Sequence, residues 1–189
     1  MRYVPIMELP FLIIMVLVRA AILRRRGIKA IVFGDTDKTD FFIIPVVFCS
    51  FYAILSAVFD LPFPYILKRA FWDITILNWA AIVICSISLI WFGITLTVFG
   101  NSFRVGIDEK TTDALVTTGP FAFSRNPIYV SFIAFFLGIF LAYATVITGV
   151  FLLFLVILIH RQILREEKFL ESFYGKKYEE YCVHVRRYI

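Results

Sequence analysis

The sequence predicts an all-α protein, a polytopic membrane helix bundle of about five transmembrane helices. Apolar residues make up 61% of the 189 residues and charged residues only 17%, against about 45–50% and about 25% in ordinary globular chains. The apolar residues gather in long uncharged runs, and Phe alone accounts for 22 positions. A soluble domain of this size exposes too much surface to bury so many large apolar side chains. We therefore expect an integral membrane protein.

The apolar runs define the expected spans, because about 20 helical residues cross the hydrocarbon core of a bilayer. The first three candidates are residues 4–23, 41–59 and 74–99. Residues 126–159 form a run of 34 residues without a charge, which would extend about 50 Å as one helix. This run is expected to form two shorter helices that turn near residues 143–145. The number of predicted crossings is then five.

The distribution of Lys and Arg predicts the orientation, since cytoplasmic loops carry an excess of both. With five helices, segments 24–40, 100–125 and 160–189 share one side and hold 15 of the 19 cations. The C-terminus is therefore predicted to be cytoplasmic. The net charge of +5 does not indicate nucleic-acid binding, because the basic residues flank membrane spans and no binding motif accompanies them.

Polar residues concentrate at two places on the predicted cytoplasmic side, segment 125–129 and segment 160–167. The fourth and fifth helices form a hairpin, so these places should meet at one membrane face. Taken singly, Pro127 is a helix start, Arg125 an anchor for lipid headgroups, and Glu166-Glu167 a solvated helix end. A metal site is not expected, because His160 has only one other histidine in the chain as a partner.

Three short stretches in order carry a more specific pattern. Residues 116–129 read VTTGPFAFSRNPIY, residues 165–170 read REEKFL, and residues 173–181 read FYGKKYEEY. Together they resemble the isoprenylcysteine carboxyl methyltransferase family. Its members carry a Gly-Pro/Val-Tyr stretch that leads to Arg-His-Pro-x-Tyr, then a transmembrane hairpin, then Glu-Glu-x-x-Leu and a Phe-Gly-x-x-Tyr-x-x-Tyr stretch. The resemblance extends over residues 113–187.

The resemblance implies an S-adenosylmethionine-dependent methyltransferase that methylates the α-carboxylate of an isoprenylated cysteine or a similar lipid-tailed carboxylate. Its partners would be this substrate and membrane lipids, without metal or nucleic acid. From the apolar runs, and not from the resemblance, residues 1–99 are expected to form an N-terminal part of three transmembrane helices. Residues 100–189 would form the cofactor-binding and catalytic region, with the transmembrane hairpin and an amphipathic C-terminal helix. Carried over by position, the expected cofactor-binding residues are Leu115, Val116, Phe121, Asn126, Pro127, Ile128, Tyr129, Glu166 and Glu167.

The resemblance also implies roles within this set. The apolar members would enclose adenine and ribose, and Glu166 or Glu167, with Glu166 favoured, would meet the amino group of the methionine part. Arg161 or Arg165 would meet the substrate carboxylate, which suits the planar donor fork of a guanidinium. No general base is required, because a carboxylate is already ionised at pH 7. Asn126 stands where the family has His, and it offers a donor and an acceptor but no proton transfer.

Other functions share parts of this pattern and stay open. A phospholipid-amine methyltransferase would use the same cofactor on an amine headgroup. Membrane sterol reductases carry a similar Arg-His-Pro-x-Tyr stretch but bind NADPH, which would need cationic residues for its 2′-phosphate. A non-enzymatic lipid-binding membrane protein is the remaining alternative.

Overall fold

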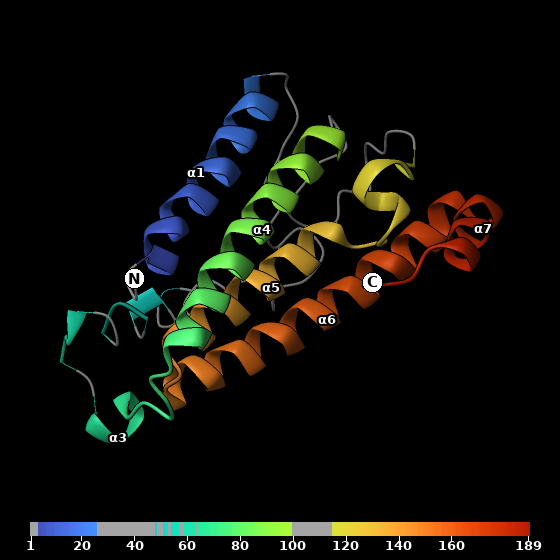
Figure 1. The fold of residues 1–189 in the computed structure, drawn as a ribbon. Coiled ribbons are helices and arrows are strands. Elements are labelled where there is room, and N and C mark those ends of the chain that lie inside the picture. Colours follow the sequence, from blue (N-terminus) through green and yellow to red (C-terminus); the bar gives the residue numbers. More distant parts are fainter. Residues whose placement is uncertain are drawn as a thin grey trace.

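The computed structural model describes residues 4–25, 48, 51–52, 54–56, 59–62, 64–99 and 115–189. Within these residues the regular structure is helical, with one isolated β-bridge between Ala70 and Thr145. Three long helices and one shorter helix run side by side, and a short helix lies with the C-terminus towards one end of the bundle (Figure 1). The all-α fold class predicted from the sequence is confirmed.

The helices match most of the predicted spans. They are α1 (Val4–Arg25), α3 (Tyr65–Lys68), α4 (Thr75–Phe99), the 3-10 helix η3 (Gly119–Ala122), α5 (Pro127–Ala142), α6 (Val146–Tyr174) and α7 (Lys176–His184). Of these, α1, α4 and α6 are long and apolar enough to cross a membrane, and α5 is a shorter apolar helix. The predicted span 41–59 lies mostly outside the described residues, so the number of five crossings stays a prediction.

The predicted hairpin in the uncharged run is confirmed. α5 ends at Ala142 and α6 begins at Val146. Thr145 caps α6 in a reciprocal arrangement, in which the Thr148 N–H donates to Thr145 Oγ1 (3.3 Å) and the Thr145 N–H donates to Thr148 Oγ1 (3.0 Å). The 29 residues of α6 extend about 43 Å, which exceeds the roughly 30 Å of hydrocarbon. Because the charged residues of α6 begin at Arg161, we expect its last turns to lie beyond the apolar layer.

The contact between α4 and α5 depends on small residues. A Cβ atom at Gly138 would lie 2.5 Å from Cys85 Sγ and 3.1 Å from the Ala81 carbonyl oxygen, so only glycine permits this approach. About two turns further along the same two helices, the rings of Phe92 and Phe132 meet edge to face with centroids 5.3 Å apart. In a bilayer, helices associate through close packing of this kind, because lipid tails are as apolar as the side chains.

α1 joins the bundle through α4. The Ser86 hydroxyl donates to Glu8 Oε1 at 2.8 Å, and Leu9 and Leu12 are buried in the same core. The outer faces of the long helices carry exposed large apolar side chains, among them Phe11, Leu17, Ile87, Ile90, Val150, Leu153, Phe154 and Ile157. Soluble proteins rarely expose apolar surface on this scale, and the pattern is that of an integral membrane protein.

Candidate functional site

Segment 124–129 enters α5 at the end of the bundle where α7 lies. The 3-10 helix η3 precedes it and holds the buried ring of Phe121 against Phe99, with centroids 4.8 Å apart. The Tyr181 hydroxyl of α7 donates to the Phe121 carbonyl at 2.6 Å. Pro127 stands at the start of α5, as expected, where its missing N–H costs no hydrogen bond. Through Phe121, η3 is thus held between α4 and α7, directly before the start of α5.

Glu167 lies buried at the polar end of α6. Its Oε1 faces Arg125 Nη2 at 3.2 Å, and its Oε2 faces Arg187 Nη2 at 2.8 Å. Arg187 Nε donates to the same Oε2 at 2.8 Å, and Asn126 Nδ2 donates to Oε1 at 3.1 Å. We call Arg125, Glu167 and Arg187 the Glu167 cluster. Two guanidinium groups thus compensate this carboxylate, as burial of a charge requires.

The expectation that Arg125 anchors lipid headgroups is wrong. Its side chain is only 12% exposed and pairs with Glu167. Arg125 is buried by tertiary packing, because both α6 and the residues that follow α7 lie against the start of α5.

The residues after α7 form an extended C-terminal segment, 185–189, that returns over the motif (Figure 1). The Arg125 N–H donates to the Arg186 carbonyl at 2.9 Å. The Arg187 carbonyl accepts from Asn126 Nδ2 at 3.2 Å and from Ser124 Oγ at 3.4 Å. The C-terminal segment therefore connects α7 to the beginning of α5 through its backbone, and to α6 through the side chain of Arg187.

Glu166 points to different partners from its neighbour, as expected for adjacent helical residues about 100° apart. Its Oε1 accepts from the Tyr129 hydroxyl at 2.6 Å and from Gln162 Nε2 at 2.9 Å. Both donors are uncharged. Burial raises the pKa of the Glu166 carboxyl, and these two hydrogen bonds and the positive charge of Arg165 oppose that rise. The acidic pair is thus divided, with Glu167 in a buried ion pair network and Glu166 on a half-buried face.

The structure brings together Asn126, Tyr129, Glu166 and Glu167 among the residues that the sequence nominated. Ile128 packs against the apolar core of the bundle. The other nominated residues differ in exposure: Phe121 and Pro127 are buried, Leu115, Val116, Ile128 and Arg165 are half-buried, and Arg161 is exposed. In the described part of the chain, no group of three or more His, Cys, Asp or Glu side chains could hold a metal ion.

Burial and hydrogen bonding raise the pKa of several groups at this end of the bundle. Burial raises the pKa of Tyr181 to about 12, so its hydroxyl keeps its proton and its hydrogen bond to Phe121 near neutrality. The hydrogen bond to Glu167 raises the pKa of Arg187, so this guanidinium stays charged. Arg187 therefore keeps its ion pair with Glu167 at neutral pH.

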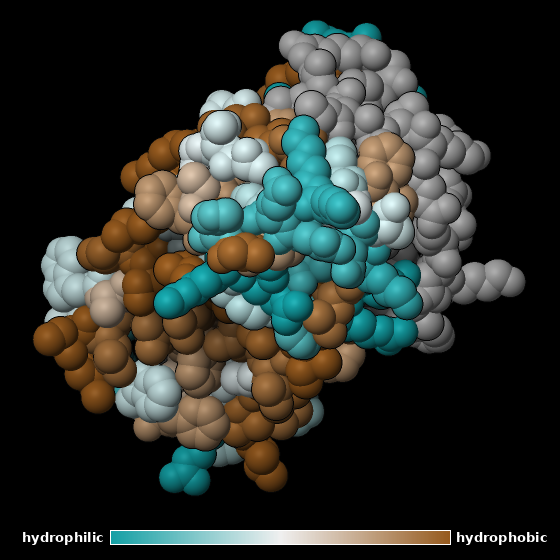
Figure 2. Space-filling view, turned by 90° about the vertical axis from the view of Figure 1, so that its right-hand side faces the viewer, coloured by the Kyte–Doolittle hydropathy of each residue, from teal (hydrophilic) through white to brown (hydrophobic). Residues whose placement is uncertain are grey.

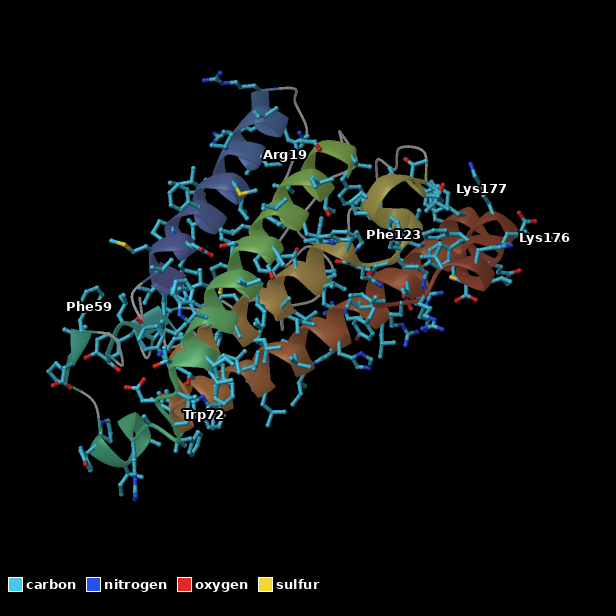
Figure 3. The ribbon with its side chains drawn as sticks, in the orientation of Figure 1. Arg19, Phe59, Trp72, Phe123, Lys176 and Lys177 are labelled. Atoms are coloured by element: carbon cyan, nitrogen blue, oxygen red, sulfur yellow. The ribbon has the colours of Figure 1, made fainter. Side chains whose placement is uncertain are left out.

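Figure 2, which faces this end of the molecule, shows polar residues gathered in a central patch with apolar residues beside it. Lys176 and Lys177 extend from α7 at one end of the structure, and Trp72 lies at the opposite end, near the α5–α6 turn (Figure 3). Sequence reasoning missed Arg187, which it counted only as one of the cations that set the topology. Its role depends on the return of the C-terminal segment, for which the sequence carries no periodic signal.

The sequence profile of the phospholipid methyltransferase family matches residues 73–177. This range is more than half of the 189 residues. The chain belongs to the phospholipid methyltransferase family. The matched range includes α4, η3, α5 and α6, and with them Asn126, Tyr129, Glu166 and Glu167. No curated protein gives a significant match.

Among solved structures, the fold of this family member is similar to that of a eukaryotic intramembrane Ras methyltransferase, isoprenylcysteine carboxyl methyltransferase, with a TM-score of 0.64. Sequence identity is 22%, and the alignment covers 89% of this chain. It covers 58% of that chain, so this protein spans little more than half of the length of the eukaryotic enzyme. The resemblance found in the sequence is confirmed.

Proposed function

We propose that this protein transfers a methyl group from S-adenosylmethionine to the carboxylate of a lipid-tailed substrate of the isoprenylcysteine type. One observation carries the proposal. The segment that begins α5 contacts the acidic pair of α6, through Asn126 to Glu167 and Tyr129 to Glu166. This polar site lies at the end of helices whose outer faces are apolar. A water-soluble cofactor and a lipid could therefore meet here.

The residues at the site fit S-adenosylmethionine. Both Asn126 N–H groups are already used, by Glu167 and by the Arg187 carbonyl, so its Oδ1 is the atom left to accept from a ligand. Within the described part of the chain, Glu166 accepts hydrogen bonds from the uncharged Tyr129 and Gln162, and its carboxylate can hold the amino group of the methionine part. We assign the half-buried Leu115, Val116 and Ile128 to the adenine and ribose, with the buried Phe121 and Pro127 supporting that surface.

When bound, S-adenosylmethionine supplies a methyl group on a cationic sulfur that departs as a neutral thioether. The protein then has to orient the acceptor and remove water from it, because the carboxylate arrives ionised. Near-attack alignment of two reactants is worth about 7–11 kcal/mol. Arg165 is half-buried and precedes Glu166, so we favour it over the exposed Arg161 for holding the substrate carboxylate.

The lipid tail has an apolar path to this site. Val150, Leu153, Phe154 and Ile157 are exposed on the transmembrane half of α6. At helical spacing the same face continues to Arg161 and Arg165 at the polar end, whereas Glu166 is turned about 100° away from Arg165. A tail that lies on this face keeps its contact with the bilayer while its headgroup reaches the polar end. Lateral entry of this kind requires no water-filled channel.

The first test is ligand binding and methyl transfer by the purified protein in lipid nanodiscs. Tritiated S-adenosylmethionine should bind and NADPH should not. N-acetyl farnesylcysteine should be methylated, and its amide, which lacks the carboxylate, should serve as the unreactive control. Binding of NADPH in place of S-adenosylmethionine would identify a reductase, and binding of neither would indicate a non-enzymatic lipid-binding protein.

The family match favours a second candidate, the methylation of a phospholipid amine headgroup. An amine acceptor needs carboxylate or aromatic groups near the methyl donor, and Glu166 with Tyr129 could supply them. The two candidates differ in their use of Arg165, which should matter for a carboxylate and not for an amine. Faster methylation of phosphatidylethanolamine than of N-acetyl farnesylcysteine would establish the second candidate.

We also propose that the site lies on the cytoplasmic face. The buried Tyr143 is a poor labelling position, so the exposed Asp73 represents the opposite end of the bundle. Asp73→Cys and Lys177→Cys, each made in a chain with its natural cysteines replaced by serine, should react with a membrane-impermeant maleimide from opposite sides of sealed vesicles. Labelling of both from the same side would contradict the predicted topology.

A further inference from the structure

We infer that Arg187 is a positioning residue of the cofactor site, which acts through Glu167 and Asn126. It neutralises Glu167 and fixes the orientation of the Asn126 amide, so that Glu166 is the carboxylate that faces the ligand. This inference rests on the proposed function, since it concerns the site assigned there to S-adenosylmethionine.

The contacts of Arg187 divide between its side chain and its backbone. Nε and Nη2 both lie 2.8 Å from Glu167 Oε2, a fork that holds one carboxylate oxygen in place. The Arg187 carbonyl accepts from Asn126 Nδ2 at 3.2 Å, while Glu167 Oε1 accepts from the same nitrogen at 3.1 Å. Arg187 therefore supplies one of the two acceptors of this amide and fixes the other, which orients Asn126 Oδ1 away from both.

The charges of the Glu167 cluster make this role measurable. Arg125 and Arg187 contribute one positive charge each and Glu167 one negative charge, so the cluster carries a net charge of +1. Arg187→Gln lowers this charge to zero, Glu167→Gln raises it to +2, and the double variant restores +1. S-adenosylmethionine carries a sulfonium charge that S-adenosylhomocysteine lacks. A more positive cluster repels the sulfonium of S-adenosylmethionine and leaves the neutral sulfur of S-adenosylhomocysteine unaffected. The ratio of the two affinities therefore responds to the charge of the cluster.

The experiment compares dissociation constants for both ligands on the full chain in nanodiscs, measured by calorimetry. Relative to the parent, Arg187→Gln should shift the preference towards S-adenosylmethionine by about 3- to 10-fold, because it removes one of the positive charges that repel the sulfonium. Glu167→Gln should shift it the other way by a similar factor, and the double variant should return to within about 2-fold. Arg187→Lys should keep the preference while both ligands bind more weakly, because it keeps the charge and loses the fork.

The matched control is Arg186→Gln. The Arg186 side chain is exposed and only its backbone carbonyl contacts Arg125, so the preference should stay at the parent value. If Arg187→Gln fails to yield folded protein, Arg125→Gln makes the same change in cluster charge and should give the same shift.

The outcomes separate the two proposals. If the parent binds both ligands and the single variants change both affinities equally, Arg187 has a structural role only and the inference is overturned. If the parent binds neither ligand, the proposed function itself fails. Opposite shifts in the two single variants, with recovery in the double variant, support the positioning role.

Discussion

The α4–α5 contact and the Glu167 cluster are both buried, but different forces hold them together. Between α4 and α5, Gly138 admits the side chain of Cys85, and the rings of Phe92 and Phe132 pack together further along the same contact. In the cluster, a carboxylate lies between Arg125 and Arg187. Lipid tails give no solvent-driven advantage to the first contact, so shape decides its strength. The strength of the Glu167 cluster depends instead on how well the two guanidinium groups compensate the buried carboxylate. Substitutions should accordingly affect folding in the first region and ligand binding in the second.

The largest expected effect is that of Gly138→Val. A Cβ atom there would lie 2.5 Å from Cys85 Sγ and close to the backbone of Ala81, so α4 and α5 would have to separate. We expect loss of the monodisperse folded protein in detergent, measured by size-exclusion chromatography and thermal unfolding. Gly149→Ala is the control, because its Cβ would meet only the ring edge of Phe140 at 3.1 Å. A Gly138→Val protein as stable as the parent would show that close approach does not hold this pair.

The next largest effect is that of Arg165→Ala on the methylation rate, with the fold unchanged. Arg165→Ala should lower the rate of carboxylate methylation by roughly 100-fold, in line with about 1.5–3 kcal/mol for a hydrogen bond to a charged group. Its affinity for S-adenosylhomocysteine should change by less than about 3-fold. Arg161→Ala, four residues earlier on an exposed position, provides the comparison. If both variants keep full activity with a carboxylate substrate, neither Arg165 nor Arg161 holds the substrate carboxylate.

The smallest effect concerns the tie between α7 and η3. Tyr181→Phe removes the hydrogen bond to the Phe121 carbonyl and should cost about 1 kcal/mol. Burial raises the pKa of Tyr181 to about 12, above its unfolded value of about 10. Its contribution is therefore complete below pH 10 and is lost as the pH rises towards 12. The difference in thermal midpoint between parent and variant should shrink over this range, and a constant difference would contradict the assignment.

Much of the fold could be predicted because the membrane imposes simple rules on the sequence. The uncharged run 126–159 is too long for one crossing, which predicted a turn at residues 143–145, and Thr145 caps the second helix there. The spans α1 and α4 follow from hydropathy alone. The extension of α6 to Tyr174 was not predicted, because its polar half no longer carries the apolar signal.

The site could be predicted only in part. The hairpin and the resemblance brought segment 125–129 to the acidic pair, and the contacts of Asn126 and Tyr129 agree with this proximity. The partners of Glu167 could not be predicted, because Arg187 reaches it through the return of the C-terminal segment. Arg125 was misjudged for the same reason. A basic residue beside a membrane span looks alike in sequence whether it faces a headgroup or a buried carboxylate.

The central claim is that Glu166, and not the compensated Glu167, supplies the charge that holds the amino group of the cofactor. The most direct measurement is the dissociation constant of S-adenosylhomocysteine for the parent and for Glu166→Gln. Loss of a charge-assisted hydrogen bond of about 1.5–3 kcal/mol predicts binding that is roughly 10- to 150-fold weaker, in a variant that still purifies as a folded, monodisperse protein. An affinity equal to that of the parent would contradict the placement of the cofactor at this end of α6.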